Sequence, residues 1–204
     1  MYTKVDGIIV IGKAAEFVSD IQIPIVSTDT FCENGILKAL KEAIEYFIER
    51  NVADIGFISE KRTESKLDSF KDIMEEKAGG VNEKFIRVTD KRFEEGGYFA
   101  MNELLESGNV PRAIICAYDY MAIGAMRCIF DKGMKVPEDI AVLGMDDISQ
   151  ARYLNPPLSS ISFCVDEVCK AAVDTIIGIL TEKESRINVL FEAKLKLRRS
   201  TQID

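Results

Sequence analysis

Short apolar runs rich in β-branched residues alternate with amphipathic segments along most of this 204-residue chain. Continuous apolar runs of this length are typical of strands covered on both faces, as in parallel sheets. The segments between them repeat apolar residues three and four positions apart, as amphipathic helices do. Strands are expected at 5–11, 23–27, 55–59, 85–88, 113–117 and 140–144, and helices at 35–50, 64–77, 94–106 and 120–131.

This alternation predicts an α/β fold with a mostly parallel, doubly wound sheet. Over residues 145–157 a loop that contains a double proline interrupts the alternation of strands and helices. A further strand is expected at 160–163, an apolar-rich helix at 165–180 and an edge strand at 189–197. Open α/β sheets bind ligands beyond the carboxyl ends of their strands, so ligand contacts are expected in the loops there.

The composition argues against several classes of function. The chain has no His and no Trp, and 34 acidic against 26 basic residues give a net charge of −8. Without His, the commonest general base and metal ligand is missing, and Ser-His or Cys-His pairs are impossible. We therefore expect no enzyme activity. Phosphate affinity needs clustered Lys and Arg, and with this net charge we expect no DNA-binding surface on this chain.

The cysteines indicate a reducing compartment. They are odd in number, show no C-x-x-C spacing and mostly lie within apolar runs, so they are expected to be buried, reduced thiols. They are Cys32, Cys116, Cys128, Cys164 and Cys169. The opening residues have the pattern of a strand rather than a signal peptide, and no apolar stretch approaches the ~20 residues of a membrane helix. We therefore expect a soluble, cytoplasmic protein without a membrane partner.

Acidic side chains follow two of the expected strands. Asp146 and Asp147 come directly after one buried run, and Tyr118 and Asp119 follow another. Asp146 is a candidate ligand-binding residue, and Tyr118 is expected to point into the cleft that the loops enclose. Asp is also a favoured helix N-cap, so we expect Asp147 and Asp119 to cap helices, and capping stays an alternative for Asp146.

Carboxylates and a tyrosine at strand ends suit a hydroxyl-rich ligand, because a carboxylate accepts hydrogen bonds from adjacent sugar hydroxyls. A glycosidase could use two carboxylates, but it needs a defined separation that a sequence does not show. The run from Gly7 to Lys13 fits a phosphate-binding loop only in part, since Ala14 stands where Ser or Thr is required. No G-x-G-x-x-G motif occurs, and we expect neither a cofactor nor a metal.

A series of short motifs runs through nearly the whole chain in a fixed order. They are Val5-Asp6-Gly7-Ile8-Ile9, Ile23-Pro24-Ile25-Val26, Ala117-Tyr118-Asp119-Tyr120-Met121-Ala122-Ile123-Gly124-Ala125, Val136-Pro137-Glu138-Asp139-Ile140, Gly144-Met145-Asp146-Asp147, Asn155-Pro156-Pro157-Leu158 and Leu197-Arg198-Arg199-Ser200-Thr201. Each is weak alone, but in this order and spacing they are highly specific. In these motifs the chain resembles the lactose-repressor (LacI/GalR) family of bacterial transcription regulators, in its effector-binding domain.

The resemblance implies a type I periplasmic-binding-protein-like fold of two doubly wound parallel-sheet lobes, with a small-molecule effector, expected to be a carbohydrate, between them. Residues 1–30 with 163–186 would form the N-terminal lobe, and residues 31–162 with 187–204 the C-terminal lobe. Crossovers between the lobes would lie near Thr30, Ser162 and Ile187.

The resemblance also implies that the N-terminal lobe is incomplete. The family's helix-turn-helix headpiece and the first strands of that lobe have no counterpart here, so operator DNA would be reached only through an absent headpiece. Because an unpaired apolar strand edge promotes association, Met1–Thr30 is expected to pair with another chain or to be mobile.

Four positions match the family's effector site. Asp146 would hydrogen-bond effector hydroxyls, Tyr118 stands in place of a family Asn, and Lys66 in place of a family Arg. Phe93, in the Arg92-Phe93 region, would supply a stacking or capping side chain. Lys offers a point charge where Arg offers a planar fork, and Tyr would narrow the pocket or stack on a sugar face. A solvated helix position stays open as the alternative for Lys66.

Family dimers form along the effector domains, and the matching positions are Ile123 and Leu154. Both are apolar, which fits a homodimer interface, although a core position is the alternative. The chain is thus interpreted as the effector-sensing and dimerising part of a transcription regulator. A stand-alone or exported sugar-binding protein is the runner-up, and an enzyme that uses carboxylates is the third alternative.

Overall fold

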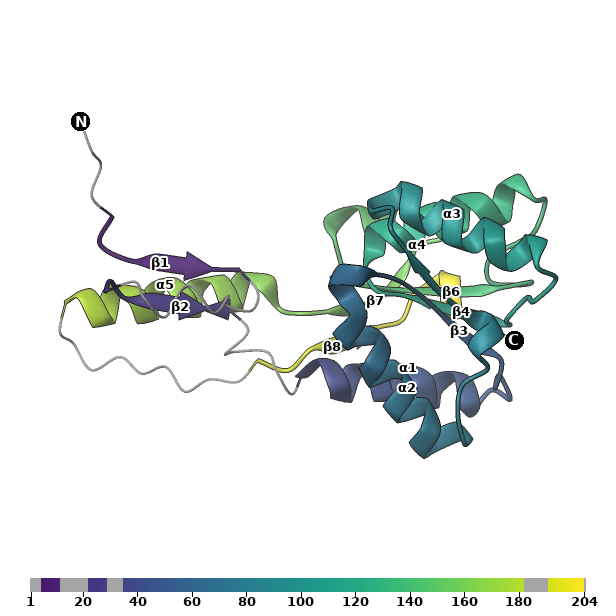
Figure 1. The fold of residues 1–204 in the computed structure, drawn as a ribbon, viewed down its shortest axis with the longest axis horizontal. Coiled ribbons are helices and arrows are strands. Elements are labelled where there is room, and N and C mark those ends of the chain that lie inside the picture. The colour runs from purple at the N-terminus through teal and green to yellow at the C-terminus, as the bar shows by residue number, and fades with distance from the viewer. Residues whose placement is uncertain (1–4, 12–21, 29–34, 182–190, 204) are drawn as a thin grey trace. The chain divides into compact units, whose positions relative to one another are not determined.

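The computed structural model describes residues 5–11, 22–28, 35–181 and 191–203 (Figure 1). By contacts the chain divides into two compact units, Met1–Ile36 with Phe163–Lys194 and Leu37–Ser162 with Leu195–Asp204. The expected crossover positions Thr30 and Ile187 lie outside the described residues, as does Cys32. Each unit is an α/β assembly with parallel strands, which confirms the predicted fold class.

The larger unit is built on a sheet with the strand order β4-β3-β5-β6-β7-β8. Its strands are β3 (Ile55–Glu60), β4 (Ile86–Thr89), β5 (Ala113–Cys116), β6 (Ala141–Met145), β7 (Ser159–Ser162) and β8 (Lys194–Lys196). Every pair from β4 to β7 is parallel. The carboxyl ends of these strands therefore share one edge of the sheet, where α/β proteins place their ligand contacts.

Helices cover both faces of this sheet. Figure 1 shows α1 (Gly35–Ile48) and α2 (Glu64–Ala78) on one face, and α3 (Phe93–Glu106) and α4 (Asp119–Asp131) on the other. Two short 3-10 helices follow later, η5 (Ser149–Tyr153) and η6 (Arg199–Thr201). Because both faces are covered, every residue of β3, β5 and β6 is buried, which explains their continuous apolar sequences.

The crossing of α3 and α4 depends on two glycines. A Cβ atom added at Gly97 would lie 1.9 Å from the carbonyl oxygen of Met121, and one at Gly124 would lie 1.9 Å from that of Glu94. Both obstacles are backbone atoms of the neighbouring helix, which a side-chain rotation does not move. The close crossing brings together the first turns of the two helices, where Phe93 lies near Tyr118.

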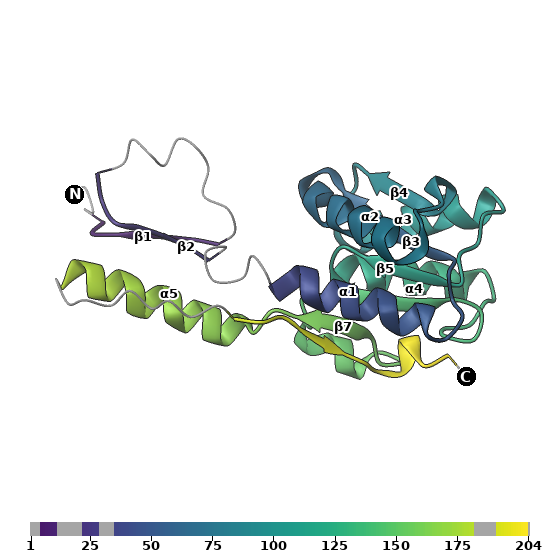
Figure 2. The same cartoon turned by 90° about the horizontal axis from the view of Figure 1, so that it is seen from below.

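In its described residues, the smaller unit consists of the strands β1 (Ile8–Val10) and β2 (Ile25–Ser27) and the helix α5 (Val165–Leu180) (Figure 2). The two strands pair in parallel and are shorter than the sequence predicted. The helix α5 has the predicted bounds and packs one face on these strands. The core of this unit consists of Val26, Val168, Ala171, Ala172 and Ile176, with Phe191 against it.

Two of the four described cysteines depart from the expectation of burial. Cys116 and Cys128 are buried, but Cys164 is half-buried and Cys169 is exposed. The prediction is wrong for Cys169 because α5 buries only one face and this side chain lies outside it. Among the helices that the structure describes, none combines the length and apolarity needed to cross a membrane.

Substituting Gly124→Ala should destabilise the protein. The added methyl group meets a backbone oxygen, so α3 and α4 must separate, and overpacking of this kind costs about 1–3 kcal/mol. Urea unfolding at equilibrium measures the change. Glu103→Ala, at an exposed position of α3, is the control and should change the unfolding free energy by less than about 0.5 kcal/mol. Equal stability of the two variants would show that the helices do not need this close crossing.

Candidate functional site

The four residues proposed from sequence all lie in the larger unit, on segments that follow a carboxyl strand end. Lys66 lies in the first turn of α2 after β3, and Phe93 begins α3 after β4. Tyr118 lies between β5 and α4, and Asp146 follows β6 directly. Contacts join them as two pairs, Lys66 with Asp146 and Phe93 with Tyr118. The shared direction of the strands is what gathers these distant positions.

Lys66 is drawn inward rather than into solvent. Its Nζ donates a hydrogen bond of 2.7 Å to the carbonyl oxygen of Ala117 and lies 3.9 Å from Oδ1 of Asp146. The side chain is 21% exposed, and burial lowers the pKa of the ammonium, with Asp146 and Asp119 opposing that shift. The alternative of a solvated helix position is therefore wrong for Lys66.

Asp146 is the more exposed of the two side chains in this polar pair. Its side chain is 39% exposed, and burial still raises the pKa of its carboxyl group, while Lys66 opposes the shift. The 3.9 Å separation from Lys66 is longer than a hydrogen bond. One hydroxyl group between them could accept from the ammonium and donate to the carboxylate, so the pair suits a hydroxyl-bearing ligand.

Phe93 and Tyr118 form the aromatic part of the site. The Tyr118 side chain is almost fully buried, and its hydroxyl oxygen accepts the backbone N–H of Phe93 at 2.9 Å. Phe93 has a φ of 54°, which is unusual for a bulky residue, and the residue is 46% exposed. The ring meets Tyr118 and Tyr120 edge to face, at centroid distances of 6.1 and 5.9 Å. Tyr118 thus supports Phe93, and the open ring belongs to Phe93.

Arg92 contacts two neighbouring side chains, although its own side chain is 45% exposed. Its Nε donates to both carboxylate oxygens of the buried Glu60, at 3.1 and 3.2 Å, and its guanidinium lies over the Phe93 ring. Within the Arg92-Phe93 region, both side chains are therefore open to a ligand, with the guanidinium of Arg92 over the ring of Phe93.

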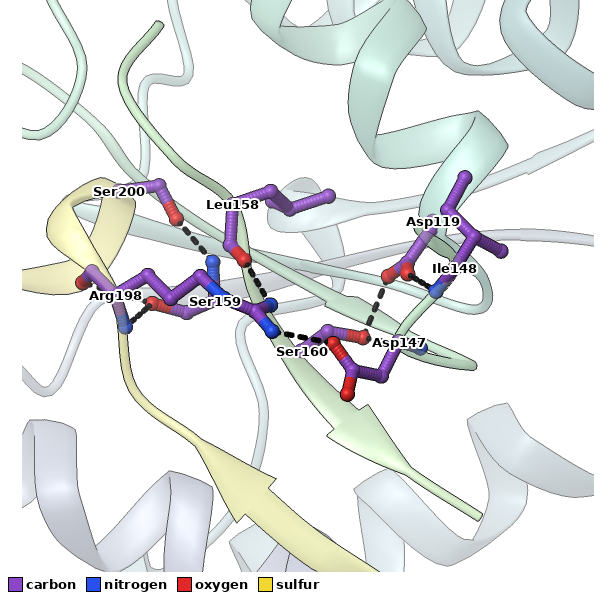
Figure 3. A network of polar contacts seen from close by, with 8 residues as sticks. All are labelled: Asp119, Asp147, Ile148, Leu158, Ser159, Ser160, Arg198 and Ser200. Carbon is purple, nitrogen blue, oxygen red and sulfur yellow. Dashed lines mark hydrogen bonds and ion pairs between the residues drawn. The ribbon is translucent and has the colours of Figure 1, made fainter. Parts of the chain in front are cut away.

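Asp119 was predicted to cap a helix, and that prediction is wrong. The N-cap of α4 is Tyr118, and Asp119 is the first helical residue. Its carboxylate is fully buried, where Oδ1 accepts from the Ser160 hydroxyl at 2.6 Å and Oδ2 accepts from the Ile148 N–H at 2.8 Å (Figure 3). Burial raises its pKa to about 7, against the lowering effect of these two hydrogen bonds. Gly144 makes room for it, since a Cβ there would lie 2.1 Å from Oδ1.

Asp147 does not cap a helix either. Its Oδ1 accepts a hydrogen bond of 2.6 Å from Nη2 of Arg198, and the two side chains are only 11% and 17% exposed (Figure 3). Arg198 also donates to the carbonyl oxygen of Leu158 at 2.7 Å. This buried ion pair ties the loop after β6 to the end of the chain. Nothing in the local sequence around Asp147 signals a partner 51 residues away.

The expected dimer positions lie together on another part of the surface. Ile123 and Leu154 are both half-buried and line a mostly apolar depression of about 150 Å³. The other residues that line it are Met126, Arg127, Phe130 and Asn155. Neither side chain is a fully buried core residue, and neither lies in the polar network around Asp146.

Comparison with known proteins identifies relatives of the whole chain. Residues 44–201 match the family described as a periplasmic binding protein-like domain. The probable HTH-type transcriptional repressor ExuR of Bacillus subtilis is 32% identical over 161 residues, which cover 74% of this chain and 46% of the relative. The ribose operon repressor of Haemophilus influenzae is 29% identical over 218 residues, or 98% of this chain and 65% of the relative. The chain thus spans about half to two thirds of the length of these relatives.

A solved structure is also similar to nearly the whole chain. The sugar-binding transcriptional regulator of the LacI family from Escherichia coli, complexed with phosphate, has 25% identity and a TM-score of 0.82. The match covers 96% of this chain and 76% of that one. The similarity therefore extends through both units and beyond the motifs at which it is visible by eye.

Replacing Arg198 with Met should destabilise the protein by about 3 kcal/mol, because it leaves the buried Asp147 carboxylate without its cation. Urea unfolding measures this loss, and the double variant with Asp147→Asn should recover part of it. Arg199→Met is the matched control, since its ion pair with Glu138 is 3.7 Å long and exposed, and surface pairs contribute little. A loss at Arg199 as large as that at Arg198 would contradict this assignment.

Proposed function

Because the chain belongs to the LacI/GalR family and carries its periplasmic-binding-protein-like domain, we propose that it is the effector-sensing part of a transcription regulator. The proposed effector is a small hydroxyl-rich molecule, a sugar or sugar derivative. Its binding would shift the equilibrium between conformations of the effector domain and thereby the operator affinity of a helix-turn-helix headpiece. The proposed site of action is the cytoplasm, where operator DNA lies.

The observation that carries this proposal is the polar pair Lys66 and Asp146 on the same strand-end edge as the open ring of Phe93. A cation and a carboxylate 3.9 Å apart offer a donor and an acceptor to the same hydroxyl group. An exposed phenyl ring suits the apolar face of a sugar ring. Two of the relatives carry sugar names, the ribose operon repressor and the sugar-binding regulator, which supports the same ligand class.

The structure also bears on the enzyme alternative. A carboxylate glycosidase would need a second carboxyl group beside Asp146 that faces the substrate. Asp119 and Asp147 are acidic residues close to Asp146, but both oxygens of Asp119 and Oδ1 of Asp147 accept from protein donors at 2.6–2.8 Å. The relatives are named as repressors, which favours sensing over catalysis. The same names favour a regulator over the runner-up, an exported or stand-alone sugar-binding protein.

Isothermal titration of the full chain against D-ribose, D-glucose, D-galacturonate, cellobiose, inorganic phosphate and adenine tests the proposal. We expect a sugar to bind and Asp146→Asn to weaken that binding about 10- to 100-fold, as the loss of a hydrogen bond to a charged group does. Asp72→Asn, an exposed carboxylate on α2, is the matched control and should leave affinity unchanged. Preference for phosphate or adenine, or equal affinity of the Asp146 variant, would contradict the proposed ligand class.

We further propose that the apolar depression around Ile123 and Leu154 is a homodimer contact. Leu154→Glu places a charge there and should raise the dimer dissociation constant at least about tenfold, which light scattering after size exclusion measures. Val88→Glu, at an exposed apolar position on β4, is the control and should not change the mass. A monomeric parent chain, or a dimer indifferent to Leu154→Glu, would reject this interface.

A further inference from the structure

The loop formed by residues 146–148 has an unfavourable backbone conformation, which depends on contacts with its surroundings. Asp146 has a φ of 108° and Asp147 a φ of 51°, both in regions that side-chain-bearing residues seldom adopt. Consecutive residues in such conformations persist only where the surroundings determine them. The groups that bind this loop therefore decide where the Asp146 carboxylate lies.

Hydrogen bonds fix each residue of this loop from the sheet or from α4. The N–H of Asp146 donates to the Ile161 carbonyl oxygen at 2.8 Å, and the N–H of Asp147 donates to the Ser160 hydroxyl at 3.0 Å. The Ser160 hydroxyl in turn donates to Asp119, whose other oxygen receives the Ile148 N–H (Figure 3). One carboxylate thus holds the loop at two points, directly at Ile148 and through Ser160 at Asp147.

Several charged or titratable groups face Asp119. Asp146 and Asp147 on the loop disfavour its ionised form, and Lys66 on α2 and Cys116 on β5 interact with its charge. Arg198 neutralises Asp147 from the end of the chain. The balance of burial against these neighbours and the two hydrogen bonds sets the pKa of Asp119 at about 7.

We propose that Asp119 is a positioning residue for the effector site, whose ionised carboxylate holds the loop that presents Asp146 and whose protonation releases it. A protonated carboxyl group must donate its own hydrogen, so it no longer accepts from both Ile148 and Ser160 in the present arrangement. The two hydrogen bonds lower the pKa of Asp119 while burial raises it, so a carboxyl group that loses these bonds but stays buried holds its proton more tightly. The effector site therefore loosens on acidification through neutral pH. This inference rests on the proposed function, since the loop matters to the effector only if Asp146 binds it.

An NMR titration of the full chain between pH 5 and pH 9 tests this without any effector. The carboxyl carbon of Asp119 and the amide of Ile148 should titrate together, with one midpoint near pH 7. Hydrogen exchange at the amides of Asp147 and Ile148, corrected for intrinsic rates, should be protected above the midpoint and faster below it. A flat Ile148 amide, or protection that does not follow the Asp119 carbon, would overturn the proposal.

Four variants test whether Asp119 is the group that causes this transition. Ser160→Ala removes a donor to the carboxylate, which favours the protonated form and should move the midpoint up by about one pH unit. Asp119→Asn should abolish the Ile148 transition, whereas Asp146→Asn should keep it at a lower midpoint. Asp131→Asn, on the same helix but paired with Arg127, is the control and should leave the midpoint unchanged.

If Asp119→Asn does not fold, the titrations of the parent chain and of Ser160→Ala still decide, and an unchanged midpoint in Ser160→Ala contradicts the proposal. Because the titration contains no effector, its failure leaves the sugar-binding test untouched. A failure of sugar binding, with the transition intact, would reject the proposed function and leave the loop mechanism standing.

Discussion

The parallel pairing of β3, β5 and β6, with helices on both faces, is the constraint on which the larger unit depends. Every residue of these strands is buried, so no strand can shift its register without breaking both faces of the core. The same pairing sends all carboxyl ends to one edge. Lys66, Tyr118 and Asp146 therefore lie on neighbouring segments, although the first and the last are 80 positions apart in the chain.

Much of this arrangement could be predicted from the sequence, because it follows from local periodicity. The bounds of α5 agree fully, and those of α2, α3 and α4 differ by one residue from the expected ones. The strand ends then identify Asp146 as a ligand candidate, and resemblance adds Lys66 and Phe93. The short strands β1 and β2 were expected to be longer, because an apolar run does not show where its hydrogen-bonded partner ends.

The side-chain partners could not be predicted, because they join segments far apart in the sequence. Asp119 and Asp147 were interpreted as caps, the common local role of Asp beside a helix. In the structure their partners are Ser160 and Arg198, which are 41 and 51 residues away. Burial makes such distant partners obligatory, since an unpaired carboxylate in the core is far costlier than an unmade cap.

The need for buried partners also explains why the candidate site has an open part and a supporting part. Asp146 and Phe93 are the more exposed members, at 39% and 46%, and both have positive φ values. A buried neighbour holds the backbone of each segment. Asp119 accepts the N–H of Ile148 in the loop that carries Asp146, and the Tyr118 hydroxyl accepts the N–H of Phe93. Strained backbone is stable only where buried groups determine it. The chain therefore keeps these supporting polar groups inside and leaves exposed the side chains that they orient, as the proposed effector site requires.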